Sequence, residues 1–433
     1  MKKTIFINAR IVDPTQKIDK LGTLTVENKK IIEISFEKFN SKYKDNNEVI
    51  NCKNLILSPG FVDLKCHLRV PGDEHKENLS YASEAAASSG ITSLVCMPNT
   101  NPIIDNVSIV ELLQRKARKE SHVKIFSTGS ITKKLEGNEL SEFGLLSEAG
   151  AVAFTDATTA VNNASVMYKA LKYASAFDIL LMQHPEEKYL SKGGSMTSGT
   201  LSTELGIKGI PIEAEVIQVE RDIRLAEMTS GKIHFLNIST GLAIDAIKSA
   251  QEKGLKISCS TSPHYFSLDE TNIKKWRTFA KLSPPLRDKK SVADVKLGIL
   301  NNVITCITSD HSPHDTDSKR LPFEVASPGS IGFESLLPLT LNLVKEKKLG
   351  LLKLVELISS NPAKLLNLKA GSLKKGSNAD IVLFDPNKKI NLSSALIKSK
   401  SKNFPYENKK AFGKVYLTMV DGKIIFRDGK FNI

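Results

Sequence analysis

The sequence predicts an α/β protein: a closed (β/α)8 barrel of the TIM type, with a small β-sandwich domain formed by both termini. Three observations support this fold. The chain has 433 residues, whereas such a barrel needs roughly 250. Strand-like and helix-like segments alternate through the middle of the chain, and short alternating strands fill both ends. We therefore expect residues 1–57 plus 368–433 to form the β domain, and residues 58–367 to form the barrel.

The two ends of the chain share one pattern. Apolar and polar residues alternate over short segments at residues 4–12, 22–26 and 30–34, with Asp-Pro and Glu-Asn turns between them. The same alternation returns near the C-terminus, at residues 379–386 and 415–426. This pattern predicts one β domain that is closed by pairing between the two termini and interrupted by the barrel.

The middle of the chain contains eight apolar strand segments separated by helix-length stretches. One such stretch, residues 78–89, predicts a helix that ends at Gly90. Polar residues gather at the end of nearly every strand, which is where (β/α)8 barrels place their chemistry. The eight segments lie within residues 58–69, 91–97, 123–127, 151–156, 179–184, 233–237, 255–259 and 303–310.

Composition excludes several classes of protein. No apolar run approaches the roughly 20 residues that cross a bilayer, so we expect a cytoplasmic protein with no membrane partner. The five cysteines are scattered without a CxxC pair, which argues against a disulfide framework or a zinc knuckle. The net charge is +14, but the lysines are spread along the chain and no nucleic-acid motif accompanies them. We expect no nucleic-acid partner, and we interpret residues 398–402 as a basic surface loop.

The first barrel strand ends in an unusual pair. Many metal-dependent hydrolases carry His-x-His at this point, because alternation along a strand puts both side chains on one face. Here the two positions are Lys65 and His67. An ammonium group cannot ligate a cation. We predict instead that Lys65 pairs with Asp310 and supplies positive charge in place of a metal.

Several blocks at the strand ends resemble the dihydroorotase family of the amidohydrolase superfamily. The blocks are Pro-Gly-Phe-Val-Asp at 59–63, Met-Pro-Asn-Thr at 97–100, Lys-Leu-Ser-Pro-Pro-Leu-Arg at 281–287, Ser-Asp-His-Ser-Pro-His at 309–314 and the stretch 371–380. The resemblance implies cyclic-amide chemistry in de novo pyrimidine biosynthesis, in which carbamoyl-aspartate and dihydroorotate interconvert. It also implies a pair of zinc ions that activate water.

The resemblance assigns six metal-ligand positions to this chain. Three hold residues that can ligate zinc, namely His67, His184 and Asp310, of which Asp310 would also be the catalytic proton shuttle. The other three hold Lys65, Ala157 and Asn237. Ala157 stands where the bridging carboxylate would be. We therefore expect no zinc or a single zinc, and weak or absent catalysis.

Other residues complete the expected site. The resemblance implies that Arg69, Asn99 and His314 hold the substrate, while Ser283 replaces an asparagine. We considered Asp156 and His234 as substitute ligands, but the two-residue period of a strand points both away from the site. We expect Asp63 to make hydrogen bonds within the barrel.

Three functions remain open. The first is a dihydroorotase-like protein that has lost most of its metal chemistry and is a partner of aspartate carbamoyltransferase, with which family members commonly assemble. The second is an active dihydroorotase with one zinc held by His67, His184 and Asp310. The third is another cyclic-amide hydrolase, such as a hydantoinase or an allantoinase, which the retained Arg69 and Asn99 disfavour. Because family members usually self-associate, we also expect a homo-oligomer.

Overall fold

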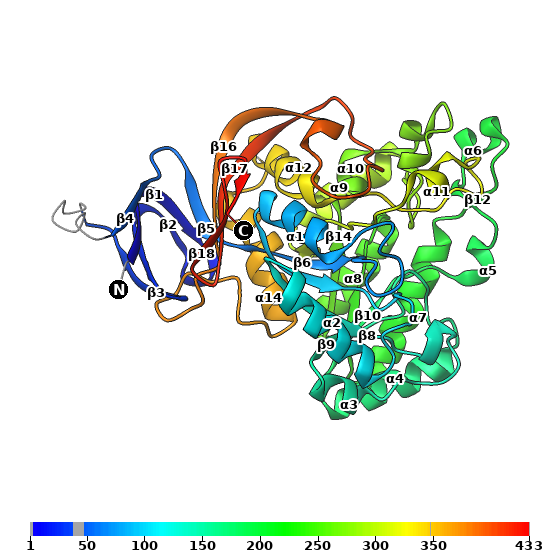
Figure 1. Cartoon of the computed structure of the whole chain (residues 1–433). Helices are drawn as coiled ribbons and strands as arrows, with labels where there is room; N and C mark the ends of the chain where they lie inside the picture. The colour runs from blue at the N-terminus through cyan, green and yellow to red at the C-terminus, as the bar shows by residue number, and fades with distance from the viewer. Residues whose placement is uncertain (1–2, 38–46, 347, 433) are drawn as a thin grey trace.

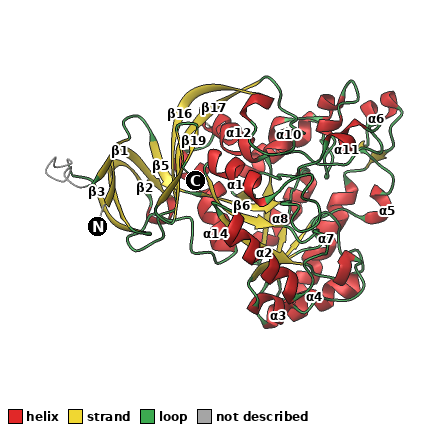
Figure 2. Cartoon of the chain, viewed as in Figure 1, coloured by secondary structure: helices red, strands yellow, loops and turns green. Residues whose placement is uncertain are grey.

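The computed structural model describes residues 3–37, 47–346 and 348–432. Figure 1 shows two parts: a β-sheet built from both ends of the chain, and a larger body in which helices surround a parallel barrel. Figure 2 shows that the helices lie outside the barrel strands. Both parts agree with the predicted fold.

The first sheet joins the two termini. It has nine strands in the order β19-β18-β17-β16-β5-β1-β2-β3, and β4 pairs with β1. The junction is the antiparallel pairing of β5 with β16, in which Leu57 lies opposite Leu383. The strands are β1 Lys3–Asp13, β2 Ile18–Glu27, β3 Lys30–Ser35, β4 Glu48–Asn51, β5 Ile56–Pro59, β16 Ile381–Leu392, β17 Lys409–Val420, β18 Lys423–Arg427 and β19 Lys430–Phe431.

The second sheet is the barrel. Its eight strands run in the order β15-β14-β13-β10-β9-β8-β7-β6, and every pairing is parallel. A parallel bridge between Cys66 and His311 brings the first strand to the chain after the last one, so the barrel is nearly closed. The strands are β6 Phe61–Cys66, β7 Ile91–Cys96, β8 Lys124–Gly129, β9 Ala151–Phe154, β10 Leu180–Gln183, β13 Lys232–Phe235, β14 Ile257–Thr261 and β15 Cys306–Ile307.

Helices and a two-stranded ribbon complete the barrel. The helix predicted at 78–89 is α1, which begins after the Asn78 cap and ends before Gly90, whose φ is +83°. The helices are α1 Leu79–Ser88, α2 Val107–Glu120, α3 Phe143–Glu148, α4 Ala164–Ala176, α5 Lys188–Ser191, α6 Thr200–Leu205, α7 Glu213–Thr229, α8 Gly241–Glu252, α9 Pro263–Ser267, α10 Lys289–Leu300, α11 Thr316–Arg320, α12 Phe333–Lys345, α13 Leu351–Val355 and α14 Asn361–Leu365; the ribbon is β11 Met196–Thr197 with β12 Gly209–Ile210.

The seam between β6 and the chain after β15 positions the site. Asp63 accepts hydrogen bonds from the backbone N–H of Ser309 at 2.9 Å and from the Ser309 hydroxyl. The backbone N–H of His67 donates to the carbonyl of His311 at 2.8 Å. The predicted structural role of Asp63 is therefore confirmed, and the seam fixes the ends of two strands side by side.

The cysteines and the helices bear on two expectations from composition. All five cysteines are buried and none is in a disulfide. In the part of the chain that the structure describes, every helix is too short or too polar to span a bilayer.

Candidate active site

Four of the sequence-predicted site positions share an unusual backbone conformation. Arg69, Ala157, Asn237 and Asp310 have φ values of 61°, 57°, 56° and 53°, in the left-handed region. Residues with a side chain seldom adopt this region, apart from Asn and Asp, and such conformations cluster at active sites. The chain therefore turns sharply at the carboxyl ends of four strands, although Ala157 contributes no polar group there.

Lys65 and Asp310 form a buried ion pair. The Lys65 Nζ donates to Asp310 Oδ1 at 2.7 Å. Only 1% of Lys65 and 5% of Asp310 is exposed. The pairing predicted from the sequence is confirmed. Each charge compensates the desolvation of the other, so removing one partner would leave a buried charge unpaired.

The two histidines expected in the site are engaged by neighbouring polar side chains. His67 Nδ1 lies 2.8 Å from Asn99 Oδ1, and His184 Nε2 lies 3.1 Å from Ser283 Oγ. Burial, assisted by the charge of Lys65, lowers the pKa of His184 to about 3. Burial also lowers the pKa of His67, and the charges of Arg69 and Lys65 add to this effect. Both rings are therefore neutral at pH 7, and His67 donates from Nδ1 to Asn99.

Unsatisfied polar atoms remain at the strand ends. Among the residues that the structure describes, neither Oδ1 nor Nδ2 of Asn237 has a hydrogen-bond partner, and the side chain is completely buried. His184 Nδ1 is also buried without a partner in this part of the chain. Unpaired buried polar groups cost about 1–3 kcal/mol each. A bound polar molecule could recover this cost.

Arg69 and His314 form a cationic corner. Arg69 donates from Nη2 to Ser312 Oγ at 3.1 Å and from Nε to the carbonyl of Pro313 at 3.1 Å. His314 Nε2 lies 2.9 Å from the carbonyl of Pro328 and 3.2 Å from Arg69 Nη2. Burial and the charge of Arg69 lower the pKa of His314 to about 3. The neutral ring donates from Nε2 to Pro328, so the net charge of the corner is that of Arg69.

The structure places the predicted substrate residues in two groups. Arg69 and His314 lie together, whereas Asn99 contacts His67. The two residues set aside from the sequence have partners of their own. Asp156 accepts from the backbone and hydroxyl groups of Thr132, and His234 Nδ1 lies 2.8 Å from Ser258 Oγ. These contacts agree with the expectation that neither side chain replaces a missing ligand.

A second buried ion pair was not predicted. Arg287 Nη2 lies 3.5 Å from Glu215 Oε2, and both side chains are buried. Arg287 also donates to Ser239 Oγ at 3.0 Å, while Glu215 accepts from the backbone of Ser239 and Thr240. The charge of Arg287 contributes to the low pKa of His184. Arg287 lies within the block 281–287 that carries the family resemblance. Glu215 lies in the first turn of α7, where a glutamate is common, so its position in the sequence does not indicate a buried ion pair.

The donors at this end of the barrel do not fit a dinuclear zinc centre. The ammonium of Lys65 is bound to Asp310 and would repel a cation, and Ala157 has no donor atom. Within residues 3–37, 47–346 and 348–432, no three His, Cys, Asp or Glu side chains are grouped so that they could hold a metal ion.

Comparison with known proteins gives a consistent set of relatives. Residues 54–242 match a family model described as dihydro-orotase-like. The chain is 41% identical over 424 residues to a dihydroorotase of Geotalea daltonii, covering 98% of this chain and 99% of the relative. It is also 41% identical over 419 residues to a dihydroorotase of Acetivibrio thermocellus, covering 96% of this chain and 97% of the relative.

Solved structures share the fold. An L-hydantoinase (dihydropyrimidinase) from Arthrobacter aurescens superimposes with a TM-score of 0.89 at 22% identity, covering 100% of this chain and 98% of the other. A dihydropyrimidinase from Brevibacillus agri superimposes with a TM-score of 0.85, also at 22% identity, covering 99% and 96%. At this identity the likeness concerns the architecture of the barrel and the β domain.

Proposed function

Because the chain belongs to the dihydroorotase family of the amidohydrolase superfamily, we propose that its barrel binds carbamoyl-aspartate and dihydroorotate in de novo pyrimidine biosynthesis with weak or no catalysis. The observation that carries this proposal is the buried pair between Lys65 and Asp310. The ligand-binding half of the site is retained, while the groups that would activate water are not.

The binding half of the proposal is supported by charge and by unsatisfied hydrogen bonds. Both ligands carry a carboxylate, and Arg69 supplies a buried cation that can pair with it. Both also carry a ureido or cyclic ureide group, which presents N–H and C=O groups. Asn237 has an unpaired donor and an unpaired acceptor that such a group can match. These two features together support the proposed ligand class.

The weak chemistry follows from what an ammonium group can do. A metal ion lowers the pKa of bound water from about 15.7 to about 7 and polarises a carbonyl group. Lys65 supplies positive charge but has no open coordination position. The ammonium lies 2.7 Å from Asp310 Oδ1, and this positive charge makes the carboxylate a weaker acceptor for a proton from water. We therefore expect the protein to bind these ligands but to interconvert them very slowly or not at all.

An active dihydroorotase with a single zinc is the second candidate. Relatives that are about 40% identical over nearly the whole chain and are named dihydroorotase favour it. In this case His67, His184 and Asp310 would hold the metal, and Lys65 would have to leave Asp310. Hydantoinase or allantoinase activity has less support, because the matching hydantoinase and dihydropyrimidinase structures are only 22% identical.

We further propose a role in assembly. A family member that binds ligand without turning it over can serve as a structural or regulatory partner, and aspartate carbamoyltransferase is the expected one. The excess of lysine suits an acidic partner surface. We expect the protein to act as a homo-oligomer in the cytoplasm and to have no nucleic-acid partner.

The deciding experiment combines metal content, binding and turnover. Zinc in the purified protein is measured by elemental analysis, dihydroorotate binding by calorimetry, and interconversion with carbamoyl-aspartate with and without added zinc. We expect little zinc, saturable binding and very slow turnover. Near-stoichiometric zinc with rapid turnover would instead establish the single-zinc enzyme. Co-purification with aspartate carbamoyltransferase tests the assembly role separately.

A further inference from the structure

We propose that the segment joining β16 to β17, residues 397–406, is part of the ligand site, and that Asn403 is a positioning residue for Arg69 and His314. We call residues 397–406 the hairpin segment. It comes from the β domain, whereas Arg69 and His314 belong to the barrel. This inference rests on the proposed function, because it concerns how the same site recognises a carboxylate.

The hairpin segment faces the barrel with every second residue. Ile397, Ser399, Ser401 and Asn403 are buried, whereas the intervening lysines are exposed. The segment is therefore the basic loop expected from its composition, but every second residue of it is buried. Lys400 donates to the carbonyl of Glu74, and Lys402 donates to the carbonyls of Ile397 and Ser399. The small polar residues meet the barrel, as in an extended chain with one buried face.

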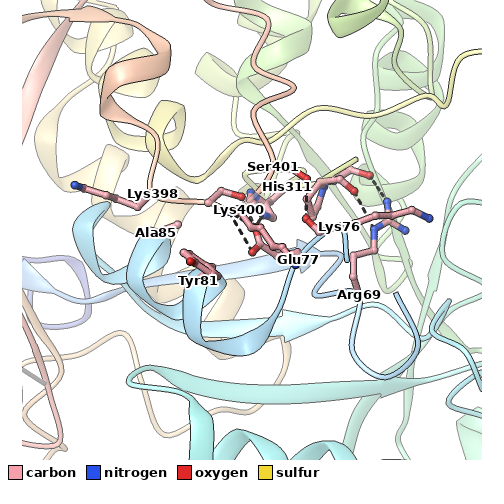
Figure 3. Close-up of polar contacts among 12 residues, drawn as sticks. Arg69, Lys76, Glu77, Tyr81, Ala85, His311, Lys398, Lys400 and Ser401 are labelled. Carbon is pink, nitrogen blue, oxygen red and sulfur yellow. Dashed lines mark hydrogen bonds and ion pairs between the residues drawn. The ribbon is translucent and has the colours of Figure 1, made fainter. Parts of the chain in front are cut away.

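The first contact is with the loop between β6 and α1, which contains Arg69. Glu77 in this loop accepts hydrogen bonds from the hydroxyl of Ser399 and from the backbone N–H of Lys400. Ser401 Oγ donates to the carbonyl of Lys76 at 2.6 Å. Figure 3 shows Lys400 and Ser401 beside Glu77 and Lys76, with Arg69 in the same loop. The hairpin segment thus holds the loop that carries the cation.

The second contact is made by Asn403, which is only 2% exposed. Its Oδ1 accepts from the backbone N–H of His314 at 3.2 Å. Its Nδ2 donates to the carbonyls of Ser312 at 3.0 Å and Gly329 at 3.1 Å. One side chain therefore fixes both the segment that carries His314 and the residue whose hydroxyl receives Arg69.

A third contact anchors the end of the hairpin segment. The hydroxyl of Tyr406 lies 2.6 Å from His264 Nδ1, and the two rings stack at 5.5 Å with an angle of 6°. Burial lowers the pKa of His264 to about 4, so its ring is neutral at pH 7. With both ends attached to the barrel, the segment can hold Asn403 in one place.

These contacts make Asn403 a link between the two halves of the cationic corner. Without its side chain, the N–H of His314 and two carbonyls lose their partner in a buried place. Ser312 and His314 can then shift, and Arg69 loses part of the framework that aims it. Small displacements of positioning groups weaken recognition strongly. The expected defect is in the affinity for a carboxylate.

The test measures L-dihydroorotate affinity by calorimetry for the parent, Asn403→Ala, Arg69→Lys and the double variant. We expect Asn403→Ala to weaken binding about tenfold, which corresponds to about 1.4 kcal/mol. If Asn403 acts through Arg69, its effect should shrink to less than about threefold in the Arg69→Lys background, because contacting residues are not additive. A merely structural role would give the same loss in both backgrounds.

Two further variants keep the test decisive. Asn391→Ala removes an exposed asparagine from β16, whose side chain donates to Asn408 Oδ1 at 3.4 Å, and should bind like the parent. Asn403→Asp keeps the acceptor for the N–H of His314 but loses the two donated hydrogen bonds, so it should also weaken binding. This variant replaces Asn403→Ala in the test if Asn403→Ala does not fold. Parent-like affinity in both Asn403 variants, or fully additive losses, overturns the inference alone. A parent that does not bind dihydroorotate overturns the proposed function and this inference with it.

Discussion

The proposal of weak or absent catalysis depends most on Lys65. We predict that Lys65→Met lowers the free energy of unfolding by about 3–5 kcal/mol, because Asp310 is left as a buried, unpaired carboxylate. Any residual hydrolase activity should stay unchanged. Urea denaturation followed by circular dichroism measures the first effect, and dihydroorotate formation measures the second.

The variant Asp310→Asn removes the other charge of the same ion pair and serves as the matched control. Alone it should also destabilise, since it leaves the ammonium of Lys65 without its counter-charge. Combined with Lys65→Met, it should recover much of the loss, because no buried charge then remains. Independent, additive losses would show that the 2.7 Å pair contributes little to stability. A large drop in activity from Lys65→Met alone would contradict the proposed function.

The three positions without metal ligands suggest a second prediction at this scale. In the triple variant Lys65→His, Ala157→Asp and Asn237→His, all six ligand positions of the family would be filled. Ala157 already has a left-handed backbone, which aspartate tolerates better than alanine does. We expect the variant to take up about two zinc ions per chain and to gain dihydroorotate formation that a chelator abolishes.

Single and double versions of these substitutions serve as controls. Asn237→His without Ala157→Asp still lacks the bridging carboxylate, so it should not hold a zinc pair. If elemental analysis finds no zinc in the folded triple variant, the assignment of these positions as former ligands is wrong. The result is independent of whether the parent protein binds dihydroorotate.

Among the elements, β6 and the chain after β15 meet at a seam that side-chain hydrogen bonds help to close. Asp63 accepts two hydrogen bonds from Ser309 across this seam. We predict that Asp63→Ala destabilises the protein by about 2–3 kcal/mol, because the backbone N–H of Ser309 loses its buried acceptor. Hydrogen exchange should rise first in residues 306–311. Asp156→Ala offers a comparison, since it should affect the contact with Thr132 instead.

The elements were predictable to different degrees, for physical reasons. Parallel barrel strands are buried on both faces, so they appear in sequence as apolar runs followed by polar ends. This signal located all eight strands, and the resemblance located Lys65, Asp310 and Arg69. The same signal could not locate Asn403, because an asparagine that follows the alternating lysines at 398, 400 and 402 has the composition of a surface loop. Only the two-residue alternation of Ile397, Ser399, Ser401 and Asn403 could have indicated a buried face.

At the scale of the whole molecule, buried neutral histidines link stability to pH. Burial makes the largest contribution to lowering the pKa of His184, His234 and His314 to about 3, from a usual value of 6.5. At these three histidines, the unfolded state therefore binds more protons than the folded state between about pH 6.5 and pH 3. Stability is fully present above pH 6.5 and is lost as the pH falls through this window.

Buried carboxyl groups oppose this trend, and Asp63 and Asp156 are two of them. Burial raises the pKa of Asp63 and of Asp156 to about 6, from 3.8. For these groups the folded state keeps a proton that the unfolded state loses, so acidification from pH 7 towards pH 4 favours folding. Burial also raises the pKa of further carboxyl groups, among them Glu186, Asp222, Glu334 and Asp380, and it lowers the pKa of His67 and His264. Removing a single histidine therefore separates the histidine contribution from that of the carboxyl groups.

We predict that the buried histidines lower the free energy of unfolding between pH 7.5 and pH 5, with each contributing up to about 1.4 kcal/mol per pH unit below its usual pKa. Urea denaturation at a series of pH values measures the slope. His234→Gln removes one such group outside the ligand site, where the ring contacts Ser258, and should reduce the slope by about one proton. A slope that is unchanged in this variant would mean that His234 is protonated in the folded protein, which its complete burial opposes.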